Sequence, residues 1–336
     1  MLITWDGVPP SDDISVDDDQ SDSNRMRRRS AIAGLVAGAV TGCSSRTDTR
    51  EQAALPERSQ SDSVASVHPS VFVPHGGGPW TIVDMGLAGQ YATLDAYLRG
   101  LLTGLSSPPR AVLCISAHWE AKQPTVMTSA APPMLYDYGG FPQAAYEFVW
   151  PAPGAPDIAA QVKDHLQSAG VAVAEDSTRG FDHGTFIPLM LSDPKAHIPT
   201  FQLSLIAGLD PAQHFAIGQA LAPLRAQGVL IVGSGMSYHN MRDFQAAFGS
   251  ATAAKRVADD SRRFDEWLDE TMIAEPSVRQ RRLIEWAEAP AARIAHPREE
   301  HLLPLMVAAG AAAEDVATTP YRGTLLGAHV RAVHLG

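Results

Sequence analysis

The chain has 336 residues and a formal net charge of −11, with 26 Lys and Arg against 37 Asp and Glu. This acidity argues against a nucleic-acid partner, because phosphate backbones are bound by basic surfaces. A hydrophobic share of 45%, with 27 glycines and 25 prolines, is typical of a globular, loop-rich protein with an ample core. Only two cysteines occur, Cys43 and Cys114, which excludes a disulfide framework and a cysteine-rich zinc site.

The first 43 residues are predicted to contain an extension and an export signal. Residues 1–25 hold seven Asp and one Arg, which indicates a disordered or untranslated extension. Residues 26–43 begin with three arginines, continue with a short apolar run and end in Gly42-Cys43, as a signal peptide does. The segment 40–43 resembles a bacterial lipobox, in which Cys43 is lipidated, and Arg28-Arg29 resembles a twin-arginine export signal.

The stretch that follows is predicted to be a flexible tether, because residues 44–66 are polar and carry little apolar content. We therefore expect an exported protein that is lipid-anchored at the membrane and faces the periplasm or the cell exterior. Its membrane contact would be through the lipidated Cys43 alone. An uncleaved interfacial helix is the alternative to this signal peptide. The sequence indicates no oligomeric state.

Residues 67–336 are predicted to form one catalytic domain, because strand and helix patterns alternate along them. The expected fold is α/β, with a central, largely parallel sheet flanked by helices and an active site at the carboxyl ends of the strands. We expect strands at 70–73, 111–115, 171–174, 200–205, 229–232 and 328–334, and helices at 87–104, 157–169, 210–227, 251–274, 277–289 and 299–313.

The stretch Ala111–Glu120 is the centre of this expected sheet. Its first five residues are suited to a strand and do not alternate with polar residues, as in a strand buried on both faces. Ser116 and Ala117 then interrupt the run. His118 is therefore expected just beyond the carboxyl end of the strand, where ligands bind in open α/β sheets.

Four further histidines occupy similarly marked places. His75 follows the first strand and opens a glycine-rich loop, and His239 follows the strand at 229–232. His183 and His301 lie in turns before helical segments. The other histidines lack such a place and are predicted to be structural or merely exposed: His68, His165, His197, His214, His296, His329 and His334.

Histidines at several strand ends would converge at one edge of the sheet. Neutral imidazoles without thiolates suit Zn²⁺ or Fe²⁺ in a site that keeps positions open for substrate. The spacing is not diagnostic, because no pair has the close helical spacing of a metalloprotease. The pattern alone therefore leaves a metal enzyme and structural histidines both open. The Pro-, Gly- and aromatic-rich segment 131–153 is expected to fold over the pocket as a lid or wall.

In their order and intervals, these segments resemble those of the DODA-type (4,5-DOPA dioxygenase-like) extradiol ring-opening dioxygenases, within the class III, LigB-like superfamily. The resemblance covers about Ser70 to Gly336. The matching segments are His75-Gly76, Ser116-Ala117-His118-Trp119, Tyr138-Gly139-Gly140-Phe141-Pro142, Tyr146 with Pro151-Ala152-Pro153-Gly154, Phe181-Asp182-His183-Gly184, Gln202-Leu203-Ser204, His239-Asn240 and Glu300-His301 with Leu303-Pro304-Leu305.

The resemblance implies an oxidoreductase that opens a catecholic aromatic ring with O₂ to a semialdehyde, using one metal per chain. That metal would be Fe²⁺ for ring cleavage, or Zn²⁺ bound at the same site. The ligands carried over by position are His75, His118, His239 and His301. His183 would be a pocket histidine that acts in proton transfer or oxygen binding.

The division of roles stays open, because related enzymes use two histidines and a carboxylate. On that pattern Glu300 or His301 would be the third ligand, and His239 would be free to act as a base. The loop Pro74–Pro79 also departs from the usual Gly-His-Gly-Ser-Pro, and an export signal is atypical of a family associated with the cytoplasm.

Two other classes of function stay open beside the dioxygenase. A zinc-dependent hydrolase would activate water with the same histidines and need no O₂. A metal- or ligand-binding lipoprotein without catalysis would also be acidic, exported and rich in histidine. Residues 132–138 and 141–150 are expected to line the pocket with aromatic rings that stack on a substrate ring. The sequence does not indicate which catechol would bind.

Overall fold

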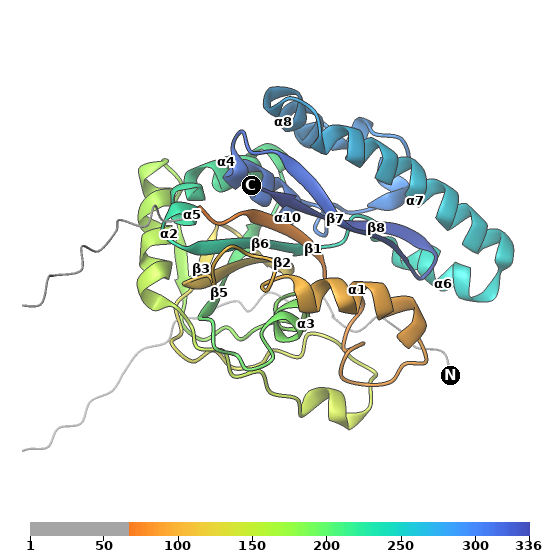
Figure 1. Ribbon diagram of the computed structural model, residues 1–336, viewed down its shortest axis with the longest axis horizontal. Coiled ribbons are helices and arrows are strands. Elements are labelled where there is room, and N and C mark those ends of the chain that lie inside the picture. Colours follow the sequence, from red (N-terminus) through yellow and green to blue (C-terminus); the bar gives the residue numbers. More distant parts are fainter. Residues whose placement is uncertain (1–66) are drawn as a thin grey trace, which may run out of the picture. The chain divides into compact units, whose positions relative to one another are not determined.

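The computed structural model describes residues 67–336, so the predicted export signal, Cys43 and the tether lie outside the described residues. Eight strands form one sheet in the order β4-β3-β5-β2-β6-β1-β8-β7 (Figure 1). The strands are β1 (Ser70–Pro74), β2 (Ala111–Ala121), β3 (Thr125–Met127), β4 (Ala174–Asp176), β5 (Thr200–Ile206), β6 (Val229–Gly235), β7 (Ala317–Leu325) and β8 (Ala328–Leu335).

Helices connect these strands and cover both faces of the sheet. The α-helices are α1 (Ala88–Gly100), α2 (Pro156–Ser168), α3 (His183–Ser192), α4 (Pro211–Leu221), α5 (Pro223–Ala226), α6 (Met241–Gly249), α7 (Ala251–Met272), α8 (Pro276–Ile284), α9 (Ala292–Ala295) and α10 (Leu303–Ala312). Two 3₁₀ turns are η1 (Gln143–Tyr146) and η2 (Trp286–Glu288).

The middle of the sheet is parallel, as the sequence predicted. β2 pairs in parallel with β5 and with β6, and β6 pairs in parallel with β1. Nearly every residue of these strands is buried, because α3 packs on one face and α10, backed by α4, packs on the other (Figure 1). The expectation of a single α/β domain with a largely parallel, helix-flanked sheet is confirmed.

The edges of the sheet differ from the expectation. β7 and β8 form an antiparallel hairpin, and β3 joins β5 in antiparallel pairing. Neither β3 nor β7 was expected, because β3 has three residues and β7 buries only every fourth residue and contains Pro320. The strand expected at 171–174 lies at β4, Ala174–Asp176.

Prolines and caps set the helix boundaries that the sequence analysis missed. The helix expected at 210–227 is two helices, because Pro223 has no amide hydrogen to continue α4 and begins α5 instead. α6 was not expected; it begins after Asn240, whose side chain accepts a hydrogen bond from the amide of Asp243. Within residues 67–336, the helices are too short or too polar to span a bilayer.

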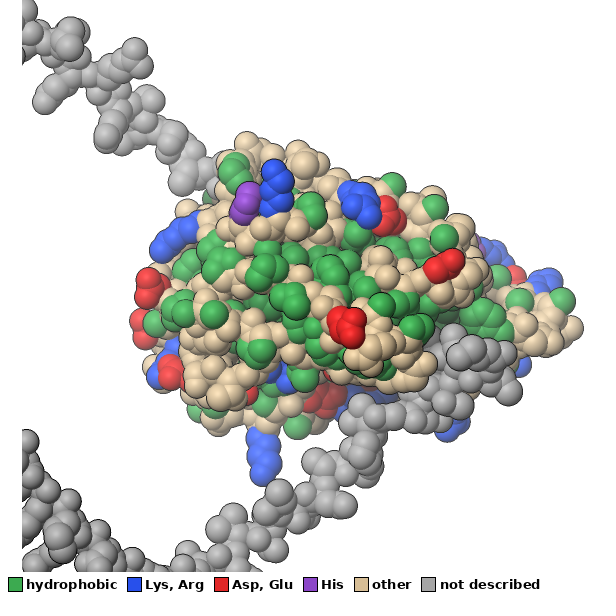
Figure 2. Space-filling model, turned by 90° about the horizontal axis from the view of Figure 1, so that it is seen from below, with side chains coloured by type: hydrophobic (Ala, Val, Ile, Leu, Met, Phe, Trp, Pro, Cys, Tyr) green, Lys and Arg blue, Asp and Glu red, His purple; other side chains and the backbone are tan. Residues whose placement is uncertain are grey.

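The surface on the side of α1 and η1 is weakly charged. Seen from there, apolar and uncharged side chains predominate, and charged side chains are scattered (Figure 2). The apolar segment 131–153 contributes to this side of the domain, where Val149 is 63% exposed. This segment is a packed wall of the domain, since Tyr136 and Tyr138 pack their rings near that of Phe186.

Candidate metal centre

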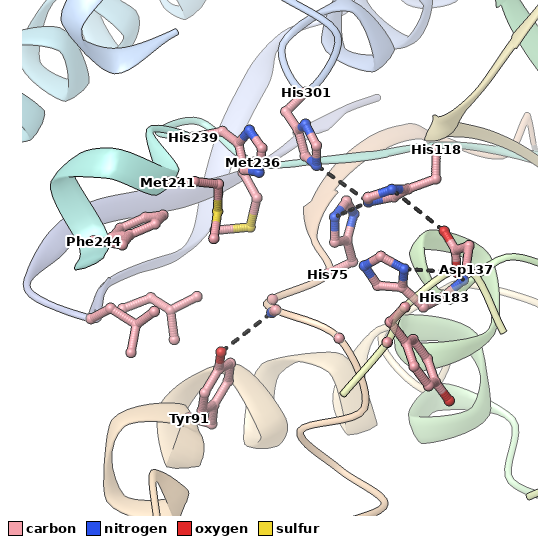
Figure 3. Close-up of a pocket in the computed structure, with 17 residues that line it drawn as sticks. His75, Tyr91, His118, Asp137, His183, Met236, His239, Met241, Phe244 and His301 are labelled. Atoms are coloured by element: carbon pink, nitrogen blue, oxygen red, sulfur yellow. Dashed lines mark hydrogen bonds and ion pairs between the residues drawn. The ribbon is translucent and has the colours of Figure 1, made fainter. Parts of the chain in front are cut away.

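The five histidines marked in the sequence all line one pocket of about 200 Å³ (Figure 3). His75 follows β1, His183 is the first residue of α3, and His301 lies just before α10. His118 was expected beyond the end of its strand, but β2 continues to Ala121. The strand loses its pairing with β5 after Ile115 and regains it at Glu120, and this irregularity turns the His118 ring into the pocket.

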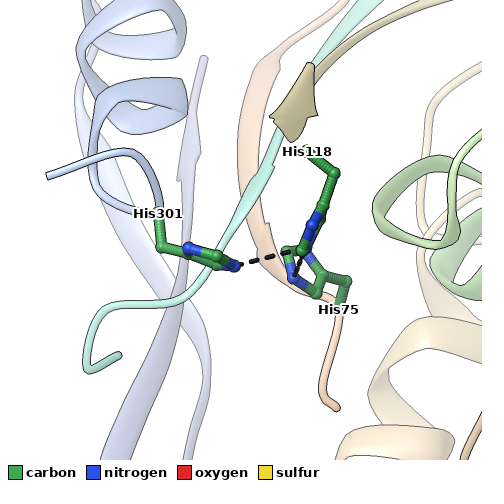
Figure 4. A group of neighbouring side chains, drawn as sticks. All are labelled: His75, His118 and His301. Atoms are coloured by element: carbon green, nitrogen blue, oxygen red, sulfur yellow. Dashed lines mark hydrogen bonds between the residues drawn. The ribbon is translucent and has the colours of Figure 1, made fainter. Parts of the chain in front are cut away.

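Three of these histidines bring their Nε2 atoms together (Figure 4). Nε2 of His118 lies 3.1 Å from Nε2 of His75 and 3.3 Å from Nε2 of His301. The three residues come from β2, from the loop after β1 and from the approach to α10. The fold thus assembles the trio His75, His118 and His301 from distant parts of the chain.

The acceptors near the opposite ring nitrogens indicate which nitrogen atom carries the proton. Ser234 donates its hydroxyl hydrogen to the carbonyl of Gly184, so its oxygen accepts from Nδ1 of His75, 3.1 Å away. Nδ1 of His301 lies 3.0 Å from Glu300 Oε1, and Nδ1 of His118 lies 3.5 Å from Asp137 Oδ2.

An acceptor lies near each Nδ1, within hydrogen-bond distance for His75 and His301 and at 3.5 Å for His118, which favours the hydrogen there and a lone pair on each Nε2. Three acceptor lone pairs then face one another with no donor between them, an arrangement that a cation resolves. Histidines that ligate metals are held in this way, with the other ring nitrogen donating to a carboxylate or a hydroxyl. The trio fits a divalent metal by its donor set.

The electrostatics of the trio keep the rings neutral, as metal ligands must be. Burial, together with the neighbouring histidines, holds the pKa of His75 and of His118 well below the usual value. Burial likewise lowers the pKa of His301, to about 3. The Glu300 carboxylate stays ionised, because hydrogen bonds from His239 and His301 lower its pKa despite the opposing effect of burial.

Two glycines in β6 allow His301 to reach this position. A Cβ at Gly235 would lie 2.1 Å from the carbonyl oxygen of His301, and one at Gly233 would lie 2.3 Å from that of Pro304. The amide of Met236 also donates to the carbonyl of His301, at 3.0 Å. Close contact between β6 and the start of α10 therefore requires glycine at both positions.

Asp182 anchors the α3 end of the pocket. Its buried carboxylate caps α3 by accepting from the amide of Thr185, and it also accepts from the side chains of Ser116, Arg179 and Gln202. It thereby ties the helix to β2 and β5. His183 follows Asp182 directly, so this network positions its ring beside His118, with ring centroids 4.0 Å apart.

Asp137 orients His183. Its Oδ1 accepts from Nδ1 of His183 and from the same residue's amide, both at 2.9 Å. Burial alone would lower the pKa of His183, but the charge and the hydrogen bond of Asp137 raise it above its usual value. His183 thus differs from the neutral trio, and its Nε2 is the ring nitrogen that Asp137 leaves free.

His239 lies outside the trio of converging nitrogens. Its ring stacks on that of His301, with centroids 3.4 Å apart and planes 15° apart. Its Nδ1 lies 3.4 Å from Glu300 Oε1. Glu300 can form a second group of possible ligands with His239 and His301. Of the four histidines that the resemblance implies as ligands, three bring their Nε2 atoms together, and the fourth, His239, stacks on His301 instead.

The pocket lining agrees only in part with the sequence analysis. Of residues 132–138 and 141–150, which were expected to line the pocket, only Asp137 and Tyr138 do so, together with Gly139. The expectation for 141–150 is wrong, since Phe141 and Tyr146 pack against the ring of Tyr138 instead. The other lining side chains are apolar or aromatic and come from α1, the loop after β6, α6, the end of β7 and the β7–β8 turn: Tyr91, Met236, Met241, Phe244, Leu325 and Leu326. The seven histidines set aside in the sequence analysis do not line this pocket.

Known proteins share this fold and these segments. A family model described as the catalytic LigB subunit of aromatic ring-opening dioxygenase matches residues 68–332. A 4,5-DOPA dioxygenase extradiol of Beta vulgaris is 38% identical over 251 residues, which are 74% of this chain and 89% of that protein. The dioxygenase tasH of Hapsidospora irregularis is 35% identical over 322 residues, 92% of this chain and 98% of that protein.

A solved structure agrees with these matches. The crystal structure of an uncharacterised protein from Escherichia coli K12 has a TM-score of 0.63 and 27% sequence identity, and the match covers 80% of this chain and 100% of that one. The LigB family depends on a metal, and the histidine group described above can bind one. The chain belongs to the LigB family of aromatic ring-opening dioxygenases and is an oxidoreductase of the dioxygenase class.

Proposed function

We propose that the protein is an extradiol dioxygenase that opens a catecholic ring with O₂ and releases a semialdehyde. The proposal is supported above all by the convergence of three imidazole nitrogens. Nε2 of His75 and Nε2 of His301 lie 3.1 and 3.3 Å from Nε2 of His118. Three neutral imidazoles would hold one metal and leave positions open for substrate. When bound, the metal would lower the pKa of the substrate hydroxyl and, if it is Fe²⁺ rather than redox-inactive Zn²⁺, would also exchange electrons with O₂.

His183 would act as the acid–base group of the reaction. Asp137 Oδ1 accepts its Nδ1 hydrogen, so Nε2 is the atom that can take a proton from the second hydroxyl of a catechol. The ionised Asp137 stabilises the imidazolium that results. Asp137 is thus a positioning residue, since it acts through His183.

We assign His239 to the substrate side of the pocket rather than to the metal. Its ring covers one face of His301, and its contact with Glu300 runs through Nδ1. A base at this place would face a substrate from the side opposite His183, since Figure 3 shows the two rings on opposite sides of the trio. Replacing His239 by Ala should therefore reduce turnover and leave the metal content unchanged.

Anaerobic reconstitution of the full chain with Fe²⁺, followed by oxygen-electrode traces with a small panel of catechols, tests the proposal. We expect O₂ uptake with a yellow ring-opened product, and no uptake from the Zn²⁺-loaded protein. Absence of uptake on every catechol, with Zn²⁺ tightly retained, would instead favour the zinc-dependent hydrolase or the binding protein.

We also propose that the chain is exported and anchored through Cys43, on the support of the 26–43 sequence pattern. Radiolabelled palmitate should enter the wild type and not Cys43→Ala. Equal labelling of the two proteins, or none of the wild type, would contradict the anchor without bearing on the ring-cleaving activity.

A further inference from the structure

We infer that the substrate is a catechol with an uncharged, apolar substituent, which lies in an apolar arm of the histidine pocket. This apolar arm consists of Met236, Met241, Phe244, Leu325 and Leu326. The inference rests on the proposed function and names its substrate class.

The pocket has two chemically different halves (Figure 3). Asp137, His183, His118 and the rest of the trio lie at one end, where the ring hydroxyls would be held. Met236, just after β6, and Met241 and Phe244, on α6, lie at the other end. A ring whose hydroxyls face the histidines would therefore direct a substituent toward apolar side chains, which favour apolar groups.

A carboxylate on that substituent would meet no cation. Among the described residues that line the pocket, none is Lys or Arg. Three nearby arginines are already paired: Arg179 with Asp182, Arg256 with Asp243, and Arg298 with Glu120 and Glu300. Arg242, beside Met241 on α6, is exposed and does not line the pocket. The nearest acids, Asp137 and Glu300, would repel an anion, so a carboxylated catechol would bury an unpaired charge.

The two tyrosines of the pocket differ in what their hydroxyls can do. Tyr138 donates its hydroxyl hydrogen to the carbonyl of Ala145 at 2.6 Å, so it offers its ring to a substrate. The hydroxyl of Tyr91 accepts from the amide of Gly77 at 3.3 Å and keeps its own hydrogen, which a neutral polar group of a substrate could accept.

The apolar arm continues to the surface of the protein. A second hollow of about 170 Å³ shares Phe244 and Leu326 with the pocket and is otherwise lined mostly by small or apolar residues of α6 and α7. At this hollow Phe248 is 63% exposed.

The turn between β7 and β8, which contributes Leu326 to both hollows, has a strained backbone. Leu326 and Gly327 connect β7 to β8 with φ of +52° and +85°, which is the backbone of a tight two-residue hairpin. Glycine, Asn or Asp is favoured at both places, and a leucine there is strained. A leucine kept at such a position, facing two apolar hollows, is consistent with a role in binding.

Steady-state O₂ uptake by the Fe²⁺-loaded full chain tests the inference with matched substrates. We expect kcat/KM to rise about fourfold per methylene from catechol to propylcatechol, which is the gain for burying about 0.8 kcal/mol per CH₂. Dihydroxyphenylpropanoate, of similar length but charged, should be at least about tenfold poorer than propylcatechol. A carboxylated catechol or DOPA that equals or exceeds propylcatechol would overturn the inference.

A charge placed in the apolar arm should invert this preference. Met241→Lys should lower kcat/KM for propylcatechol and raise it for dihydroxyphenylpropanoate, because the new cation pairs with the carboxylate. The matched control is Ile273→Lys, at a residue that is 74% exposed and does not line the pocket. It should leave both values unchanged. An unchanged preference in folded, metal-loaded Met241→Lys would contradict the apolar arm.

Failure of the inference can be told from failure of the proposed function. If no catechol supports O₂ uptake, the dioxygenase proposal fails, but the pocket is still tested by anaerobic calorimetry with the same two ligands. Propylcatechol should then bind more tightly than dihydroxyphenylpropanoate, and the opposite order would reject the apolar arm. Uptake with catechol but no gain from the propyl group rejects the inference alone.

Discussion

Two buried polar clusters in this domain differ in how their hydrogen-bonding groups are matched. In the first, Arg331 is fully buried and donates to the carboxylates of Asp265 and Asp269 and to the carbonyl of Asp265. Arg322 adds ion pairs to both aspartates. In the second, the nitrogens of His75, His118 and His301 that face one another are all acceptors.

The difference separates a structural network from a binding site. A buried network whose donors and acceptors are all matched holds the fold, whereas surplus acceptors at close range call for a ligand. The arginine cluster joins α7 to β8 by hydrogen bonds from Arg331 to Asp265 and Asp269. The histidine cluster brings together side chains from three segments, with no donor among the nitrogens that face one another. Substitutions in the two clusters should therefore change different properties, which the following predictions test in order of decreasing effect.

His118→Ala should abolish both metal binding and turnover, because His118 is the central member of the trio. Metal content after dialysis, measured by mass spectrometry, and O₂ uptake are the two measurements. His197→Ala, at an exposed histidine outside the pocket, is the control and should keep both. A metal-loaded and active His118→Ala protein would show that the trio is not the metal centre.

His183→Ala should keep the metal and lose turnover by about 10²–10⁴-fold, the usual contribution of a general acid–base group. His183→Ala removes the imidazole that Asp137 orients but none of the three converging Nε2 atoms. Metal analysis and oxygen-electrode traces on the same preparation distinguish the two effects. Normal turnover in the purified variant would refute the role of His183.

Arg331→Met should lower the free energy of unfolding by about 3–5 kcal/mol, because it leaves the buried carboxylate of Asp265 without its main partner. The metal content of the folded protein should not change. Chemical denaturation measures the loss, and Arg262→Met provides the contrast. Arg262 is about half exposed and pairs with Asp259 on α7, so its loss should cost at most about 1 kcal/mol. Equal costs for the two variants would contradict the comparison.

His334 gives the smallest expected effect, a pH dependence of stability remote from the pocket. Burial lowers the pKa of His334 from 6.5 to about 4, and its Nε2 lies 2.8 Å from the hydroxyl of Tyr97. As pH falls below 6.5 the unfolded chain takes up this proton first. The stability is therefore fully present above pH 6.5 and is lost as the pH falls toward 4.

His334→Gln should remove this part of the pH dependence. The free energy of unfolding, measured by chemical denaturation at a series of pH values, should fall less steeply with acid in the variant. The difference between the two proteins should be at most about 3 kcal/mol, because one pKa unit is about 1.4 kcal/mol. An unchanged slope would mean that His334 does not contribute to acid sensitivity.

Much of the centre could be predicted because its signals are local. A run of buried strand residues ending near His118, and glycine-rich turns around His75 and His183, mark positions at the carboxyl edge of a parallel sheet. The trio of converging nitrogens could not be predicted, because it depends on which ring nitrogens face one another. His239 also follows a strand of the parallel sheet, yet its ring stacks on that of His301.

The apolar half of the pocket had weaker signals. Met241 and Phe244 lie on α6, a short helix whose cap, Asn240 with Asp243, could have been recognised. Leu326-Gly327 between two strands is a two-residue hairpin turn, but β7 lacks the alternation of buried and polar residues that marks a strand. Asp137 lies in an irregular segment, where no periodicity in the sequence indicates which way its side chain points.

The trio also connects parts of the chain that are far apart in sequence. His75 and His118 are 43 positions apart, and His118 and His301 are 183 apart. One ion bound to all three would act as a cross-link that closes two loops, the second of them spanning most of the domain. Such a link forms only after β1, β2 and the start of α10 have docked, so metal affinity and folding are coupled. Thermal stability should then rise with free metal concentration as the law of mass action requires.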